Sequence, residues 1–180
     1  SQSNDSGHLA RWFFSQTEFV IRGGQVRWTD DLRSGQALAL SSVNVLVRNS
    51  LRRHAFHVDA TLPADWGQTF SVNGRFRQPL LSRNTGNWRD WDGQVYTRFE
   101  AVDVSRLRQH VDLGMTVVEG NGALRAWTDF RKGQLTGATV DVALAKARLQ
   151  TDAESAPLML TDITGRLGGK RLPQGAEFST

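Results

Sequence analysis

Hydrophobic and polar residues alternate along most of this chain, and short polar stretches separate the alternating segments. The clearest example covers residues 53–62, where Phe56 and Val58 occupy alternate positions with His57 and Asp59. A period of two residues is typical of β-strands that bury one face and expose the other. Because the segments follow one another with short connections, the pattern predicts antiparallel pairing between neighbours.

The same criterion predicts strands over most of the sequence. The expected strands cover residues 18–22, 25–30, 37–48, 53–62, 69–77, 93–101, 116–130, 134–150 and 158–167. Gly23 and Gly24 predict a tight turn between the first two of these strands. The aliphatic positions of the third strand change register at Ser41 and Ser42, which predicts a β-bulge there.

Two segments have a helical rather than a strand-like spacing. Apolar residues recur at helical intervals within residues 8–16, which predicts a short helix near the start of the chain. A second short amphipathic helix is expected over residues 105–112, with Ser105 as its N-cap. Residues 78–92 are polar and irregular, so we expect a long loop there.

Strands with one apolar face must hide that face from water. A sheet of this kind closes into a barrel, packs against a second sheet, or curls around a ligand. A curled sheet that holds lipid tails would gain about 0.8 kcal/mol for each buried methylene. All three arrangements satisfy the alternation, so the pattern predicts a mainly β protein without choosing among them.

Composition narrows the class of protein. With 17 glycines and 4 prolines in 180 residues, the chain suits strands and tight turns better than a disordered linker. The net charge of +4 comes mostly from scattered arginines, whereas nucleic-acid-binding proteins concentrate basic residues on one face or helix. We therefore expect no nucleic-acid partner. The sequence has no apolar run near the roughly 20 residues that span a bilayer.

Candidate catalytic and metal-binding groups are few. The sequence contains no cysteine, which excludes thiol catalysis and cysteine metal sites. His54 and His57 are three residues apart, a spacing that places them on opposite faces of a strand and so predicts no metal site. Asp90 and Asp92 are expected at a turn, and neither a phosphate-binding glycine loop nor a Gly-x-Ser-x-Gly motif occurs. We expect no enzymatic activity, no catalytic residue, no cofactor and no metal.

Several segments together resemble the AsmA-like proteins, in particular the YhdP branch. The segments that carry the resemblance are Trp12-Phe13, Trp28-Thr29-Asp30, Val43 to Val47, His54 to Leu62, Pro63 to Gly67, Gly74-Arg75-Phe76, and Gly122 to Phe130 with Gly133. The resemblance covers the chain from about Leu9 to about Gly169. It includes no catalytic signature.

The resemblance implies a segment of a large periplasmic protein that is anchored in the inner membrane of a Gram-negative bacterium. The expected fold is an extended, strongly curled antiparallel sheet, a taco-like β-groove with one or two short helices. The implied function is transfer of phospholipid between the inner and outer membranes along an apolar groove. Residues 8–170 would form the groove segment, and residues 1–7 and 171–180 would be linkers.

The implied partners are phospholipid acyl chains, with membrane contact through parts of the parent protein outside this chain. The side chains expected to line the groove share the apolar positions of the predicted strands. They are Val45, Val47, Phe56, Val58, Phe70, Val72, Val95 and Phe99. A groove segment of this kind has open sheet edges, so edge-to-edge self-association of the isolated chain is also expected.

The tryptophans allow an alternative function. Trp88 and Trp91 lie in the polar loop and are expected to be exposed, whereas Trp28 and Trp127 lie in strand patterns and are expected to be buried or to face a groove. Exposed aromatic rings stack on sugars or bases. The alternative is a structural or interaction β-sandwich module of the bacterial envelope that binds a protein or a glycan through Trp88 and Trp91.

Overall fold

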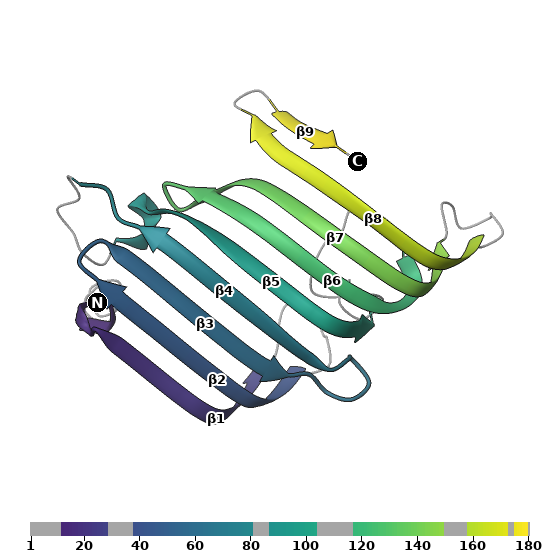
Figure 1. The fold of residues 1–180 in the computed structure, drawn as a ribbon, viewed down its shortest axis with the longest axis horizontal. Helices are drawn as coiled ribbons and strands as arrows, with labels where there is room; N and C mark the ends of the chain where they lie inside the picture. Colours follow the sequence, from purple (N-terminus) through teal and green to yellow (C-terminus); the bar gives the residue numbers. More distant parts are fainter. Residues whose placement is uncertain are drawn as a thin grey trace.

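The computed structural model describes residues 12–28, 38–80, 87–103, 117–149, 158–172 and 175–179. Its strands form one nine-stranded sheet in which every strand pairs antiparallel with the next along the chain (Figure 1). The strands are β1 Glu18–Trp28, β2 Leu38–Ser50, β3 Arg53–Thr61, β4 Thr69–Arg77, β5 Asp92–Asp103, β6 Val117–Arg131, β7 Gln134–Leu149, β8 Leu158–Leu172 and β9 Gly175–Ser179. This order is a simple meander without crossovers.

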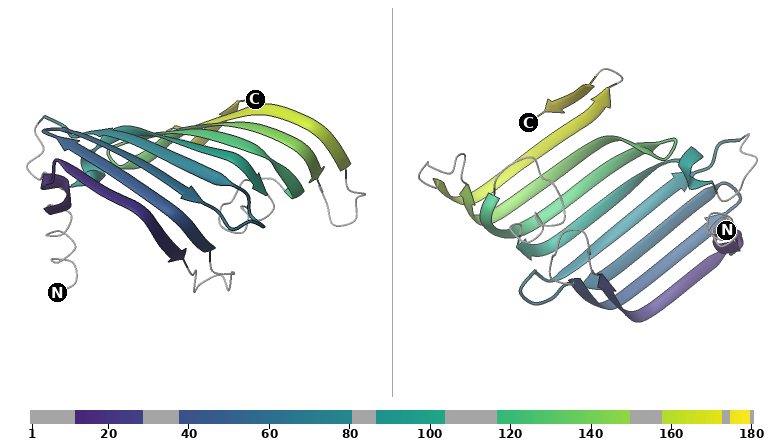
Figure 2. Two further views of the ribbon diagram at one scale, coloured as in Figure 1. Left: turned by 60° about the horizontal axis from the view of Figure 1, so that its bottom comes forward. Right: turned by 180° about the vertical axis from the view of Figure 1, so that it is seen from behind.

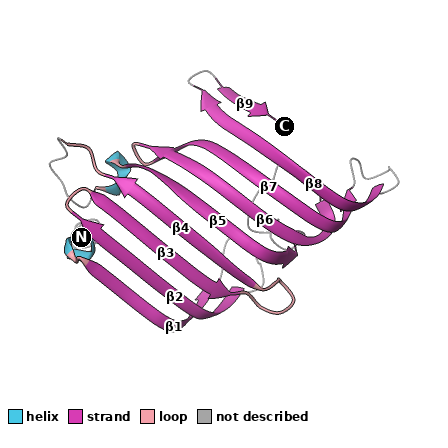
Figure 3. Ribbon diagram, viewed as in Figure 1, coloured by secondary structure: helices cyan, strands magenta, loops and turns pink. Residues whose placement is uncertain are grey.

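The sheet bends into an open arch (Figure 2). Strands β1 and β9 lie at its two edges and are not paired with each other, so the described strands form neither a closed barrel nor a sandwich. The predicted curled antiparallel sheet is therefore confirmed, and the sandwich fold of the alternative is not the fold of the described part. Among the residues that the structure describes, helical structure is limited to residues 12–15 and the 3-10 turn η1, Trp88–Asp90 (Figure 3). None of the described helical segments is long and apolar enough to cross a membrane.

The prediction of two strands separated by a turn at Gly23-Gly24 was wrong. Strand β1 continues through both glycines, and its pairing with β2 shifts register between Ile21 and Gly24. Gly23 has a φ of +64°, and its backbone N–H donates to the side-chain oxygen of Asn44 at 3.0 Å. The glycine pair therefore forms a bulge within one strand, because a backbone with positive φ satisfies a bulge as well as a turn.

The predicted bulge in the next strand is confirmed. The pairing of β2 with β3 shifts register between Ser41 and Asn44, and Ser42 has a φ of +50°. The predicted helix of residues 8–16 is confirmed at residues 12–15, and its first residues lie outside the described part, as does the whole segment 105–112. The end of the chain, predicted to be a linker from residue 171, includes β9, which pairs with β8.

The strand register divides the sheet into two chemically different faces. In each pairing, residues directly opposite one another lie on the same face, so one row can be followed across the sheet. The row through the centre consists of Ile21, Val45, Val58, Val72, Thr97, Ala126, Val140 and Leu167. The neighbouring row on the other face contains Leu46, His57, Asn73, Tyr96, Trp127 and Thr139. One face is therefore almost entirely apolar and the other is polar.

The best-packed region lies at the end of the sheet where β3, β5 and β7 approach their last residues. The buried cluster there consists of Leu62, Trp66, Val102, Leu124, Leu144 and Ala147. The connection from β3 to β4 folds back onto β5: the backbone N–H of Asp103 donates to the carbonyl of Trp66 at 2.8 Å, and that of Gln68 donates to Ala101 at 2.9 Å. This connection fixes the Trp66 ring against the sheet, because Gly67 permits a close approach of the two backbones.

The buried cluster should dominate the stability of the fold. We expect Leu124→Ala to lower the free energy of unfolding by about 2–5 kcal/mol, because Leu124 is 7% exposed and its removal leaves a cavity. Leu167→Ala is the matched control, since Leu167 is 40% exposed and should lose less than about 1 kcal/mol. Urea unfolding of both variants measures the difference. Equal losses would contradict this placement of the core.

Candidate functional site

All eight residues that the sequence predicted to line a groove lie on the apolar face. Val45, Val58 and Val72 belong to the central row. Val47, Phe56 and Val95 belong to the adjacent row, in which Gly74 lies between Phe56 and Val95. Phe70 and Phe99 are direct partners in the row on the other side, with ring centroids 5.4 Å apart. The structure brings these residues together on one face, and their contact with lipid stays a prediction.

An apolar concavity of about 380 Å³ lies on this face, and we call it the apolar groove. Its lining is Phe13, Phe14, Val45, Val47, His54, Ala55, Phe56, Val58, Phe76, Trp88, Trp91, Phe130 and Gly133. The helical residues that supply the two N-terminal phenylalanines lie on the concave side of the arch, so the apolar face is the concave one (Figure 2). The volume is within the range of pockets that hold small organic ligands.

Two glycines allow large aromatic rings to lie flat along the floor of the groove. A side chain at Gly74 would collide with the Phe56 ring, and one at Gly93 would collide with the Phe76 ring. Each glycine is the direct cross-strand partner of the aromatic residue that covers it. The rings therefore cover the backbone of the neighbouring strand instead of standing upright, which leaves the groove open above them.

Aromatic side chains close one end of the apolar groove. The imidazole of His54 stacks on the indole of Trp91 with centroids 3.9 Å apart and an interplanar angle of 4°. Phe14 packs edge-on against Trp91 at 4.7 Å, and Phe76 packs against Phe130 at 6.0 Å. Trp91 is only 3% exposed, so the expectation that it would be exposed was wrong, whereas Trp88 is 51% exposed as expected. A buried Trp91 cannot offer a ring face to a glycan.

The only ionisable residue among the groove-lining side chains is His54, and its hydrogen bonds fix its tautomer. The side-chain amide of Asn49 donates to the carbonyls of Gln16 at 2.7 Å and Phe13 at 3.3 Å. Its Oδ1 is thus the acceptor that lies 2.8 Å from His54 Nδ1, which must carry the proton. Burial lowers the pKa of His54 below its ordinary value, so the imidazole is neutral at neutral pH.

Several groove residues were missed by sequence reasoning. The aromatic end wall comes from residues 13, 14, 88 and 91 together with Phe76 and Phe130, which are far apart in the sequence and meet only because of the register. The alternation of apolar and polar residues places Phe76 and Phe130 on the correct face. No local sequence signal predicts that residues 13, 14, 88 and 91 lie at the end of the sheet. Trp127 was expected to be buried or groove-facing, and it lies instead on the polar face beside Tyr96.

The two histidines lie on opposite faces of β3, as their spacing predicted. His54 belongs to the groove, and His57 lies on the polar face, where its ring nitrogens are 2.6 Å from Asn73 Oδ1 and 2.7 Å from Asp59 Oδ2. Among the described residues, no group of three or more His, Asp or Glu side chains is arranged to hold a metal ion.

The buried imidazole predicts a pH dependence of stability. Because the folded pKa of His54 lies below 6.5, the unfolded chain binds more protons than the folded chain, and the free energy of unfolding falls as the pH decreases below about 6.5. His54→Gln should flatten this decrease, whereas His57→Gln, which retains His54, should keep it. Urea unfolding between pH 7.5 and 5 measures both slopes. An unchanged slope in His54→Gln would rule out His54 as the responsible group.

Comparison with known proteins agrees with the resemblance seen in the sequence. The family model described as YhdP protein matches residues 1–180, the full length of the chain. No curated protein and no solved structure matched in the corresponding comparisons. The family model and the open, curled antiparallel sheet together lead to one conclusion: this chain belongs to the YhdP family of AsmA-like proteins, an envelope-associated family related to lipid transport.

Proposed function

We propose that this chain is a segment of a periplasmic protein that moves phospholipid between the inner and outer membranes, with the acyl chains on the concave face of the sheet. The observation that carries this proposal is the continuous apolar face of a single open sheet, which includes the apolar groove. The parent protein would be anchored in the inner membrane and would reach the membranes through parts outside this chain.

The energetics of the face favour an aliphatic ligand. Val45, Phe56, Val58 and Val72 are only partly buried, so the protein alone leaves apolar surface in contact with water. Covering this surface with an acyl chain would gain about 0.8 kcal/mol for each methylene removed from water. A soluble protein seldom leaves a continuous apolar surface unpartnered, because such surfaces usually mark a binding site.

The geometry also suits movement of the ligand along the sheet. The central row from Val45 to Leu167 crosses six strand-to-strand steps, which at about 4.8 Å each make a track of roughly 29 Å. One leaflet of a bilayer core is roughly 15 Å thick, so the track exceeds the length of one acyl chain. Hydrophobic contact has no preferred direction, so a lipid acyl chain can slide from one row of side chains to the next with little change in free energy. No catalytic step is proposed.

Both edges of the sheet are open in the described part. Strand β1 pairs only with β2, and β9 pairs only with β8. Unpaired strand edges are templates for further pairing. We therefore propose that the isolated chain associates edge to edge, which would extend the concave face across more than one copy.

The lipid-transfer proposal predicts that the purified chain carries phospholipid on its concave face. We expect native mass spectrometry and lipid extraction to find bound phospholipid, and Val72→Asp to remove most of it, because a carboxylate in the central row opposes burial of an acyl chain. Ser71→Asp is the matched control, since it adds the same charge one residue away on the polar face. Circular dichroism verifies that both variants fold. Equal lipid content in folded Val72→Asp and the native chain would refute the proposal.

A further inference from the structure

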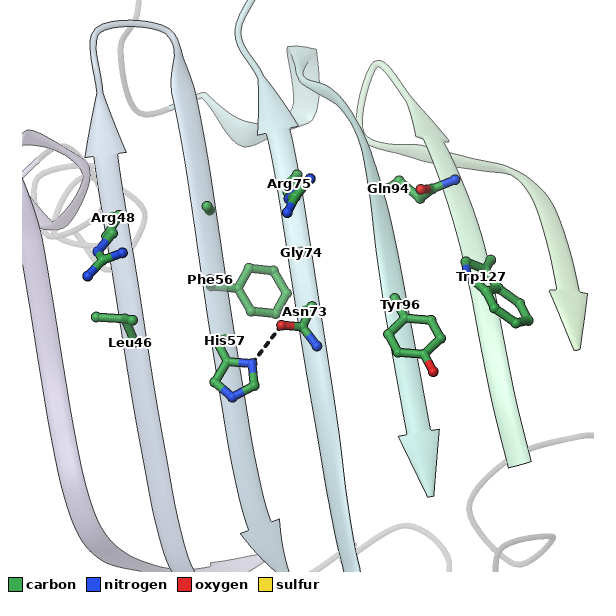
Figure 4. A pocket seen from close by; sticks show the side chains of 11 residues that line it. Leu46, Arg48, Phe56, His57, Asn73, Gly74, Arg75, Gln94, Tyr96 and Trp127 are labelled. Atoms are coloured by element: carbon green, nitrogen blue, oxygen red, sulfur yellow. Dashed lines mark hydrogen bonds between the residues drawn. The ribbon is translucent and has the colours of Figure 1, made fainter. Parts of the chain in front are cut away.

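The polar face carries a concavity of about 460 Å³ on the side of the sheet opposite the apolar groove (Figure 4). We call it the convex-face pocket. The side chains that give it its chemistry are Arg48, His57, Asn73, Arg75, Tyr96 and Trp127. They come from five consecutive strands, so the pocket lies in the middle of the sheet and not at an edge. Lipid transfer along the concave face does not use any of these groups.

The register places a notch between two arginines. Ala55 is the direct partner of Arg48 on one side and of Arg75 on the other. Two strand-to-strand steps separate the arginines by roughly 10 Å at the backbone, and the small alanine leaves space between their stems. The guanidinium of Arg48 bonds to Glu18 on β1, and its rotation toward Arg75 would let both groups hold the paired oxygens of one carboxylate or phosphate.

Only one of the two pocket arginines has an ion-pair partner within the part of the chain that the structure describes. Arg75 has no ion pair there, and the pocket lining contains no carboxylate. Arg48 pairs with Glu18 at 2.9 Å, but both side chains are at least half exposed, so this pair contributes little and exchanges readily. By contrast, Arg166 on the same face is held by both oxygens of Asp141.

A wider cationic surface continues from the notch toward the hairpin between β2 and β3. Arg53 and Arg77 are direct cross-strand partners, an arrangement that is unfavourable for like charges, and Asp92 lies opposite Arg77 on its other side. They line a second concavity of about 680 Å³, which shares Arg48, Ala55 and Arg75 with the convex-face pocket. Its lining contains four arginines and one carboxylate, Asp92, and this excess of positive charge favours a polyanion over a single ion.

The other half of the pocket is aromatic. Tyr96 and Trp127 are direct partners with ring centroids 5.2 Å apart and ring planes tilted by 43°, and both rings line the pocket (Figure 4). The guanidinium of Arg166 lies over the Trp127 ring, 6.0 Å from its centroid. Asn73 lies next to Tyr96 in the same row, and its Oδ1 already bonds to His57, which leaves its amide N–H groups directed to the pocket. Aromatic rings beside amide donors suit a ring with one apolar face and polar edges, as a sugar has.

We propose that the convex-face pocket binds an acidic oligosaccharide, with a carboxylate or phosphate between Arg48 and Arg75 and a sugar ring on Tyr96 and Trp127. A saccharide fits better than an acidic peptide, because peptides usually join a sheet at an edge strand, whereas every backbone group around this pocket belongs to a paired central strand. The site would give the protein a contact with anionic glycan while its opposite face holds lipid.

Isothermal titration calorimetry with pentagalacturonic acid tests the proposal on the full 180-residue chain. We expect saturable binding that weakens with added salt, and no binding of the neutral sugar maltopentaose. Arg75→Gln should weaken binding about tenfold or more, as expected for loss of a charge-assisted hydrogen bond. Arg125→Gln is the matched control: it removes the same charge from an exposed position outside the pocket and should change the affinity less than twofold.

Two measurements test the aromatic half of the site: the affinity of Trp127→Leu for the sugar, and the NMR signals of the native chain when the sugar is added. We expect Trp127→Leu to weaken pentagalacturonate binding, and we expect the sugar to shift the NMR signals of Ala55 and of the Trp127 indole in the native chain. Val72→Asp should retain sugar binding, which separates this site from the lipid site. No sugar binding, equal weakening by Arg125→Gln, or equal binding of oligoglutamate without dependence on Trp127 would each overturn the proposal.

Discussion

The strand register is the constraint on which the rest of the structure depends. Side chains of a strand alternate between two faces, so a shift of one residue would exchange the faces completely. In β3 and β4 the register runs without a break from Arg53 opposite Arg77 to Thr61 opposite Thr69. Where the register does shift, as at Gly23-Gly24 and at Ser41-Ser42, a bulge restores the apolar residues to the concave side. Bulges also bend and twist a strand, so the same devices contribute to the arch.

An open arch poses an energetic problem that a closed barrel does not. The sheet has only one layer, so most of its apolar face cannot be buried by a second sheet. The protein packs one end of this face tightly around Leu124 and Leu144, and closes part of the other end with aromatic rings. Between them the face remains partly exposed. We infer that stability is concentrated at the ends so that the middle remains available for a ligand.

The fold was largely predictable from the sequence, and the site only in part. Alternation gave the faces of β2 to β5 correctly, because a period of two is a local property of each strand. The sequence could not show that β1 continues through Gly23, since a glycine pair suits a turn and a bulge equally. It also could not place Trp91, whose burial depends on contacts with Phe14 and His54 from distant segments. The predicted position of Trp127 was also wrong, because the alternation assigns every large aromatic residue to the apolar face, and this one lies on the polar face.

The most direct test of the account is to locate a bound acyl chain on the sheet. Methyl NMR spectra of the native chain would be recorded with a phospholipid that carries a spin label near the end of one tail. The account predicts strong broadening of the methyl signals of Val45, Val58 and Val72 and little change for Leu46, which lies on the opposite face. Broadening of Leu46 equal to that of Val58, or none at all with lipid bound, would contradict the assignment of the concave face as the lipid path.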